Sequence, residues 1–88
     1  MSAQPAVTLV LANDVADVEK IIKQERLNPD DSACITEPSY LDFVRLYPNE
    51  KVYISANASS KLTAAIKDAA TRDLGPGQNI NLCVITSI

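Results

Sequence analysis

The sequence predicts a small α+β domain of the ferredoxin-like type, in which two helices cover one face of a four-stranded sheet in the order βαββαβ. Residues 12–23, "ANDVADVEKIIK", and residues 56–67, "ANASSKLTAAIK", align without a gap and share their first two and last two residues. Each stretch follows an apolar run, and "ACIT" at 33–36 resembles "LCVIT" at 82–86. Two strand–helix–strand halves related by a pseudo-twofold axis account for all three observations.

The length and composition are those of one globular domain. The chain has 88 residues, of which 47% are hydrophobic and 22% are charged, close to globular averages. A chain of this length buries enough surface to fold alone. We therefore treat residues 1–88 as a single domain.

The first half predicts a strand, a helix and a second strand. Residues 6–12, "AVTLVLA", form a nearly continuous apolar run that is typical of a central strand covered on at least one face. Asn13 or Asp14 can cap the helix that follows, and Asn28-Pro29 ends it. Residues 33–36 then form a short strand.

The stretch "PSYLDFVRLYP" at 38–48 has two interpretations. As a strand that turns at Pro48-Asn49 into residues 51–56, it makes a hairpin. As an extra helix over 39–47 in a small α/β fold, it has Pro38 in the first turn and apolar residues at helical spacing. The high aromatic content favours the strand slightly.

The second half repeats the pattern of the first. Residues 51–56, "KVYISA", predict a strand, and Asn57 or Ser59 can cap the next helix. Gly75-Pro76-Gly77 ends that helix. Alternating residues in "NINLCVITSI" at 79–88 predict the last strand, which runs to the end of the chain.

This fold leaves one face of the sheet open, and that face is half apolar. We expect the alternate apolar residues of the strands to face the helices; these are Val7, Leu9, Leu11, Val52, Ile54, Ile80, Leu82 and Val84. The open face then carries the predicted interface, which consists of Val10, Tyr53, Ser55, Cys83 and Ile85. Exposed apolar patches and tyrosine residues are typical of protein interfaces.

We therefore expect a non-catalytic protein-interaction or assembly module that acts through this open face or an edge strand. Its partner is a second copy of the chain, in a homo-oligomer, or a larger protein. Structural or accessory proteins of viruses and phages and small inhibitors of larger enzymes fit this description.

The alternative is a regulatory module that binds a small ligand. Its polar lining would be Asn13, Asp14, Asn57 and Ser59, at the two strand-to-helix turns. These turns present free backbone N–H groups.

Catalysis, metal binding and nucleic-acid binding have little support in the residues present. The chain has no His, which removes the commonest general base and metal ligand. Cys34 and Cys83 are expected at opposite edges of the sheet, as free thiols. A net charge of −3 does not favour binding to phosphates. We expect no enzyme activity, no catalytic residues, no cofactor and no metal.

The N-terminal stretch lacks a basic region, and its apolar run is too short for a signal peptide or a membrane span. We therefore expect a cytoplasmic or otherwise intracellular protein with no membrane partner.

Overall fold

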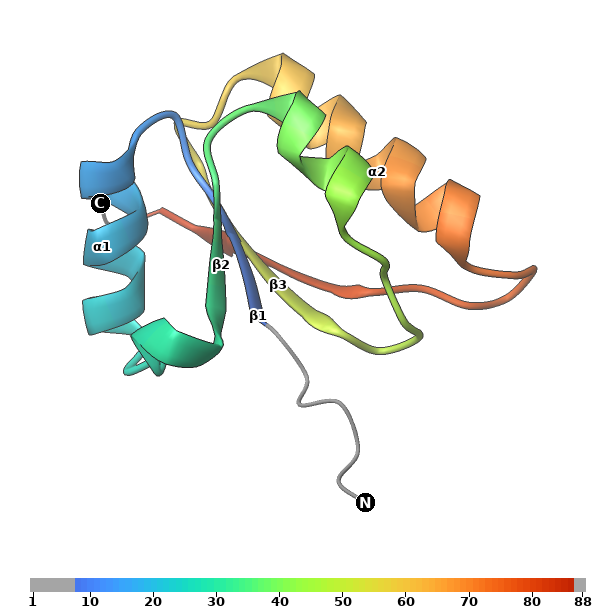
Figure 1. Ribbon diagram of the computed structural model, residues 1–88, viewed down its shortest axis with the longest axis horizontal. Helices are drawn as coiled ribbons and strands as arrows, with labels where there is room; N and C mark the ends of the chain where they lie inside the picture. Colours follow the sequence, from blue (N-terminus) through green and yellow to red (C-terminus); the bar gives the residue numbers. More distant parts are fainter. Residues whose placement is uncertain (1–7, 87–88) are drawn as a thin grey trace.

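The computed structural model describes residues 8–86, which form a four-stranded sheet with helices on both of its faces (Figure 1). The strands are β1 (Thr8–Leu11), β2 (Ser32–Ile35), β3 (Lys51–Ser55) and β4 (Asn81–Ile85). The helices are α1 (Val15–Gln24) and α2 (Ser60–Asp73), with 3₁₀ helices η1 (Pro29–Asp31) and η2 (Pro38–Phe43). The predicted strand positions Ala6, Val7, Ser87 and Ile88 lie outside the described residues.

All the strand pairs are parallel, in the order β2-β1-β3-β4. The ferredoxin-like prediction is therefore wrong, because that fold has an antiparallel sheet. What holds is the general description, a small domain of two helices and four strands whose two halves are each strand–helix–strand. A parallel sheet is covered on both faces, and this explains the nearly continuous apolar run of β1.

The reversal that we expected at 38–48 does not occur, because this stretch is not a strand. Pro38 begins the 3₁₀ helix η2, and the chain is extended again from Val44. Leu41 and Leu46 are buried against the sheet face opposite α1. The segment from β2 to β3 is thus a crossover that covers the sheet, and β3 enters parallel to β1. The alternative with an extra helix is closer to the structure, although the helix is 3₁₀ and ends at Phe43.

The two faces have separate cores. One core joins the sheet to α2 and η2, and contains Leu9, Leu11, Val52, Leu62 and Ile66 among its buried residues. The other joins the sheet to α1 and contains Val10, Ala12, Val18, Ile21, Tyr53 and Ile85. Complete burial of an aliphatic side chain stabilises the fold by roughly 1.5–3 kcal/mol. Exposing either face of the sheet to water would therefore destabilise the protein.

The prediction that both helices lie on one face is therefore wrong, and with it the open face. Helix α1 covers the face that was expected to be open (Figure 1). Val10 and Ser55 are 0% and 3% exposed, and Tyr53 and Ile85 are also buried. Cys83 alone of the five predicted interface residues is half-buried.

Candidate functional site

Strand β4 lies at one edge of the sheet, with backbone groups that point away from it. The Asn81 amide donates to the Glu50 carbonyl and the Ile85 carbonyl accepts from the Ala56 amide, both at 2.8 Å. Because the bonding direction alternates along a strand, residues 81, 83 and 85 face β3. The N–H and C=O groups of Leu82 and Val84 therefore face outward. Among the described residues, no strand pairs with this side of β4.

The side chains of the same two residues are apolar and accessible. Leu82 and Val84 lie in register with Val52 and Ile54, on the α2 face of the sheet. Leu82 is half-buried, and Val84 is 56% exposed. An edge that offers bonding groups and apolar side chains together is a template for another strand.

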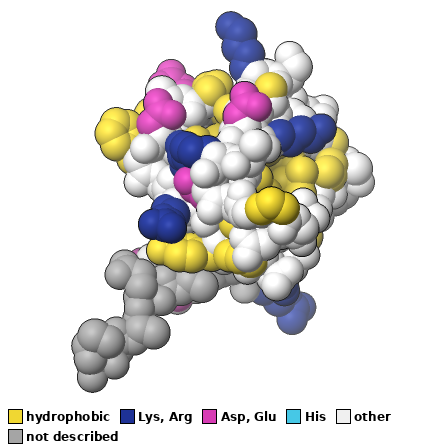
Figure 2. All heavy atoms as spheres, turned by 90° about the vertical axis from the view of Figure 1, so that its right-hand side faces the viewer, with side chains coloured by type: hydrophobic (Ala, Val, Ile, Leu, Met, Phe, Trp, Pro, Cys, Tyr) yellow, Lys and Arg dark blue, Asp and Glu magenta, His cyan; other side chains and the backbone are white. Residues whose placement is uncertain are grey.

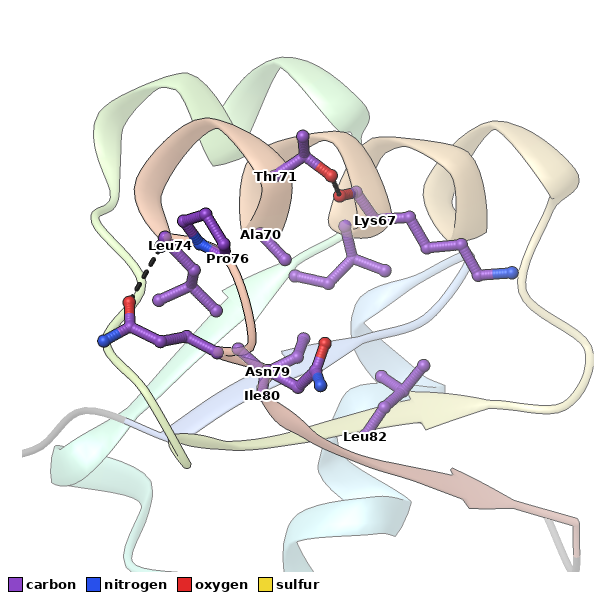
Figure 3. A pocket seen from close by; sticks show the side chains of 11 residues that line it. Lys67, Ala70, Thr71, Leu74, Pro76, Asn79, Ile80 and Leu82 are labelled. Carbon is purple, nitrogen blue, oxygen red and sulfur yellow. Dashed lines mark hydrogen bonds between the residues drawn. The ribbon is translucent and has the colours of Figure 1, made fainter.

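A groove of about 540 Å³ runs beside this edge, between α2 and the start of β4 (Figure 3). Its walls are largely apolar and include Ile66, Ala70, Leu74, Ile80 and Leu82. Figure 2, which views the side of the molecule that lies to the right in Figure 1, shows hydrophobic side chains in a shallow hollow with basic side chains beside it. Lys67 is the charged residue that lines the groove, and it is exposed.

The loop at the end of the groove is held by hydrogen bonds. The Gly75 amide donates to the Gln78 side-chain carbonyl at 2.8 Å, and the Gln78 amide donates to the Gly75 carbonyl at 3.1 Å. Gly77 has a φ of +78°, which favours glycine. The Asn79 carbonyl accepts from the Asn49 amide at 2.8 Å, which ties the loop to the turn before β3. The groove is thus shaped before any partner arrives.

The four residues of the ligand-binding alternative come together at the carboxyl ends of β1 and β3. Asp14 caps α1 by accepting from the Asp17 amide, and Ser59 caps α2 by accepting from the Leu62 amide. The Asn13 side chain bridges the two turns, because it donates to the Asn57 carbonyl and accepts from the Ser59 amide at 2.9 Å.

The ligand-binding set is therefore a real cluster of exposed residues. It lies where neighbouring helices leave for opposite faces, which is where parallel α/β sheets commonly bind ligands. The side chains of Asn13, Asp14 and Ser59, however, already bond backbone groups, and none of the four residues lines the groove beside α2.

Three exposed aromatic residues belong to the crossover that the sequence left ambiguous. Phe43 is 87% exposed, Tyr47 56% and Tyr40 43%. Tyr40 and Phe43 are three residues apart in η2, and side chains at this spacing line up on a 3₁₀ helix. The helical spacing of apolar residues at 40–47 indicates that they share one face of the segment. Only the fold shows which of these residues are exposed to solvent.

A second network attaches the crossover to α2. Arg72 donates to the Leu41 and Val44 carbonyls and forms an ion pair with Asp73 at 2.8 Å. Asp73 also accepts from the Leu46 amide at 2.8 Å. The hydrogen bond from Arg72, together with that amide, lowers the pKa of Asp73 to about 2. These groups hold the backbone in place, so we assign them a structural role.

The thiols lie at opposite edges of the sheet, as predicted, and both are free. Desolvation and the nearby charge of Glu19 raise the pKa of Cys34, which lowers its thiolate fraction. Within residues 8–86 no group of three or more acidic, Cys or His side chains is placed to hold a metal ion. The same residues include no helix long and apolar enough to cross a membrane.

Comparison of the chain with protein-family models, with curated proteins and with solved structures found no match.

Proposed function

We propose that this protein is a non-catalytic interaction module that binds a protein strand along the outer edge of β4. The main support is that Leu82 and Val84 each have backbone groups that point outward and an accessible apolar side chain. An added strand would pair with these groups, and its side chains would cover Val84 and extend into the groove beside α2.

The composition of β4 supports this role. Natural sheets protect their edges with charged residues, proline or bulges. The sequence "NLCVI" of β4 has no charge and no proline. At the other edge, β2 is flanked by Asp30, Asp31 and Glu37, whose charges oppose the approach of a strand.

Titration with a synthetic peptide tests the proposal. A peptide with the sequence of residues 79–88, in which serine replaces Cys83, is added to dilute isotope-labelled protein, and backbone amide signals are followed by NMR. We expect the largest shifts at Leu82 and Val84. Shifts scattered over the surface, or none, contradict the proposal.

Val84→Lys and Phe43→Ser form a matched pair for the same titration. Val84→Lys places a charge where the added strand must pack, and we expect peptide binding to weaken about tenfold or more, equivalent to about 1.4 kcal/mol. Phe43→Ser removes a more exposed apolar side chain from η2, which packs on α2 and β2 rather than on β4. If it weakens binding as much as Val84→Lys does, the contact is general hydrophobic adhesion.

Ligand binding at the Asn13 cluster is the second candidate. It is favoured by the meeting of four exposed polar residues at the carboxyl end of the sheet. We rank it below strand addition because the side chains of Asn13, Asp14 and Ser59 already bond backbone groups within the protein.

A further inference from the structure

We propose that the strand bound at this edge is β4 of a second copy, antiparallel and in the register that places Cys83 opposite Cys83 of the other copy. The inference rests on the proposed function and adds the identity and register of the partner. It would create one continuous sheet across two chains.

The direction follows from two-fold symmetry. In a symmetric dimer the same strand meets itself, and a two-fold axis perpendicular to the sheet makes the pair antiparallel. Outward-facing residues then form hydrogen-bonded pairs. Leu82 and Val84 are the outward-facing residues of Asn81–Ile85, so their backbone groups are available for this pairing.

The register follows from the requirement that the two copies of β4 overlap along their whole length. Asn81–Ile85 is five residues long, and Cys83 is its centre. The register that pairs all five residues therefore sets Leu82 against Val84 of the other copy and Cys83 against itself. Leu82 and Val84 are thereby bonded in both directions, and their side chains meet on the α2 face next to the two grooves.

Charge favours a second copy at this edge over the other one. A symmetric antiparallel pair brings the same strand of the two copies together, so a strand with charges of one sign opposes itself. Strand β4 carries no charge. The same operation at β2 would bring the flanking acids Asp30, Asp31 and Glu37 of both copies together. The exposed amine of Lys67 at the groove can turn into solvent.

The central pair offers a direct reporter. Cys83 faces β3 with its backbone, so the two Cys83 residues form a non-hydrogen-bonded pair, in which the Cα atoms lie about 4.5 Å apart. A disulfide requires a Cα separation of about 4.4–6.8 Å. The thiol is half-buried on the α1 face and free, which leaves it open to reaction.

The test is oxidation by the diazene reagent diamide in two single-cysteine variants. Two Cys83 thiols release two protons and two electrons, which reduce the diazene to a hydrazine as the sulfur–sulfur bond forms. We expect Cys34→Ser, which retains Cys83, to form a disulfide dimer at least tenfold faster than Cys83→Ser, which retains the more exposed Cys34. Adding Val84→Lys to Cys34→Ser should remove the advantage.

Light scattering on the unoxidised protein separates the two proposals. A dimer that Val84→Lys dissociates, together with rapid Cys83 coupling, supports the inference. A dimer without preferential Cys83 coupling overturns the register. A monomer whose Leu82 and Val84 amides still respond to the peptide overturns the second copy as partner and leaves the proposed function standing. A monomer that ignores the peptide overturns both.

Discussion

Tyr53 shows how the structure changes the consequence of a single substitution. On an open face, Tyr53→Asp would have disrupted an interface. In the structure the side chain is 8% exposed, in the core beneath α1. We expect Tyr53→Asp to lower the free energy of unfolding by at least about 3 kcal/mol, because it buries an unpaired charge. Urea unfolding followed by circular dichroism measures this.

Tyr53→Phe is the control for that substitution, since it keeps the ring and adds no charge. Its effect should be much smaller than that of Tyr53→Asp. A stable, folded Tyr53→Asp protein would show that α1 does not cover this face in solution.

Asp73 predicts how stability depends on pH. Its pKa is about 2 in the folded protein, below the ordinary aspartate value of 3.8. A carboxylate whose pKa is lower in the folded state stabilises the protein above the unfolded pKa, and this stabilisation is lost as pH falls from about 4 to about 2. We expect the urea midpoint of the wild type to fall more steeply over this range than that of Asp73→Asn.

Comparing the two proteins is necessary because Glu50 opposes the effect. Burial raises the pKa of Glu50, so its protonation favours the folded state as pH falls. Glu50 is present in both proteins, so the difference between their midpoints reports on Asp73 and on the effect of its charge on Glu50, a smaller cause of the raised Glu50 pKa than burial. Parallel pH profiles would contradict the role assigned to the Arg72–Asp73 pair.

At the scale of elements, the two strand-to-helix turns are joined by one side chain. Asn13 bonds the Asn57 carbonyl and the Ser59 amide, and so links the turn after β1 to the turn after β3. We expect Asn13→Ala to lower the free energy of unfolding by about 1 kcal/mol, the typical net contribution of such hydrogen bonds. Thermal and urea unfolding measure the loss.

Asn57→Ala is the matched control for Asn13→Ala, because Asn57 accepts from Asn13 through its backbone carbonyl, which the substitution keeps. A substitution of this exposed side chain should change the unfolding free energy by about 0.5 kcal/mol or less. Equal effects of the two substitutions would show that the side chain of Asn13 is not the link.

The arrangement of the two turns also explains the repeated Ala-Asn in the sequence. The N-caps of the two helices are Asp14 and Ser59. The repeated residues Asn13 and Asn57 both come before these caps in the chain. They hold the turns rather than starting the helices. The prediction that either of two residues could cap each helix thus resolves in favour of the second one each time.

For the whole molecule, the pseudo-twofold relation holds but its axis is different. A half-turn about a line parallel to the strands, between β1 and β3, exchanges β1 with β3, β2 with β4, and α1 with α2. In a ferredoxin-like fold the corresponding axis is perpendicular to the sheet, which leaves both helices on one face. The true axis places one helix on each face and leaves the two outer strands as edges.

This arrangement moves the candidate interface from a face to an edge. Leu82 and Val84 were expected beneath the helices, and they do lie on the α2 face. Because β4 is the last strand of the order, however, α2 leaves Val84 exposed. The edge-strand form of the interaction hypothesis therefore remains as the proposal, whereas the open-face form is excluded by burial.

The sequence by itself determined where β1, β2, β3 and β4 lie, the two long helices, the end of α2 and the repeat of the two halves, because apolar spacing, caps and the Gly75-Pro76-Gly77 stop act over a few neighbouring residues. The predicted end of the first helix at Asn28-Pro29 was wrong, because α1 ends at Gln24 and the chain turns at Arg26, where φ is +55°. Only the tertiary structure decided the direction of β3, the faces that the helices cover and the exposure of β4. These depend on the crossover at 36–50, where Leu41 and Leu46 find their burial against distant strands. Local spacing carries no information about which face of the sheet receives them.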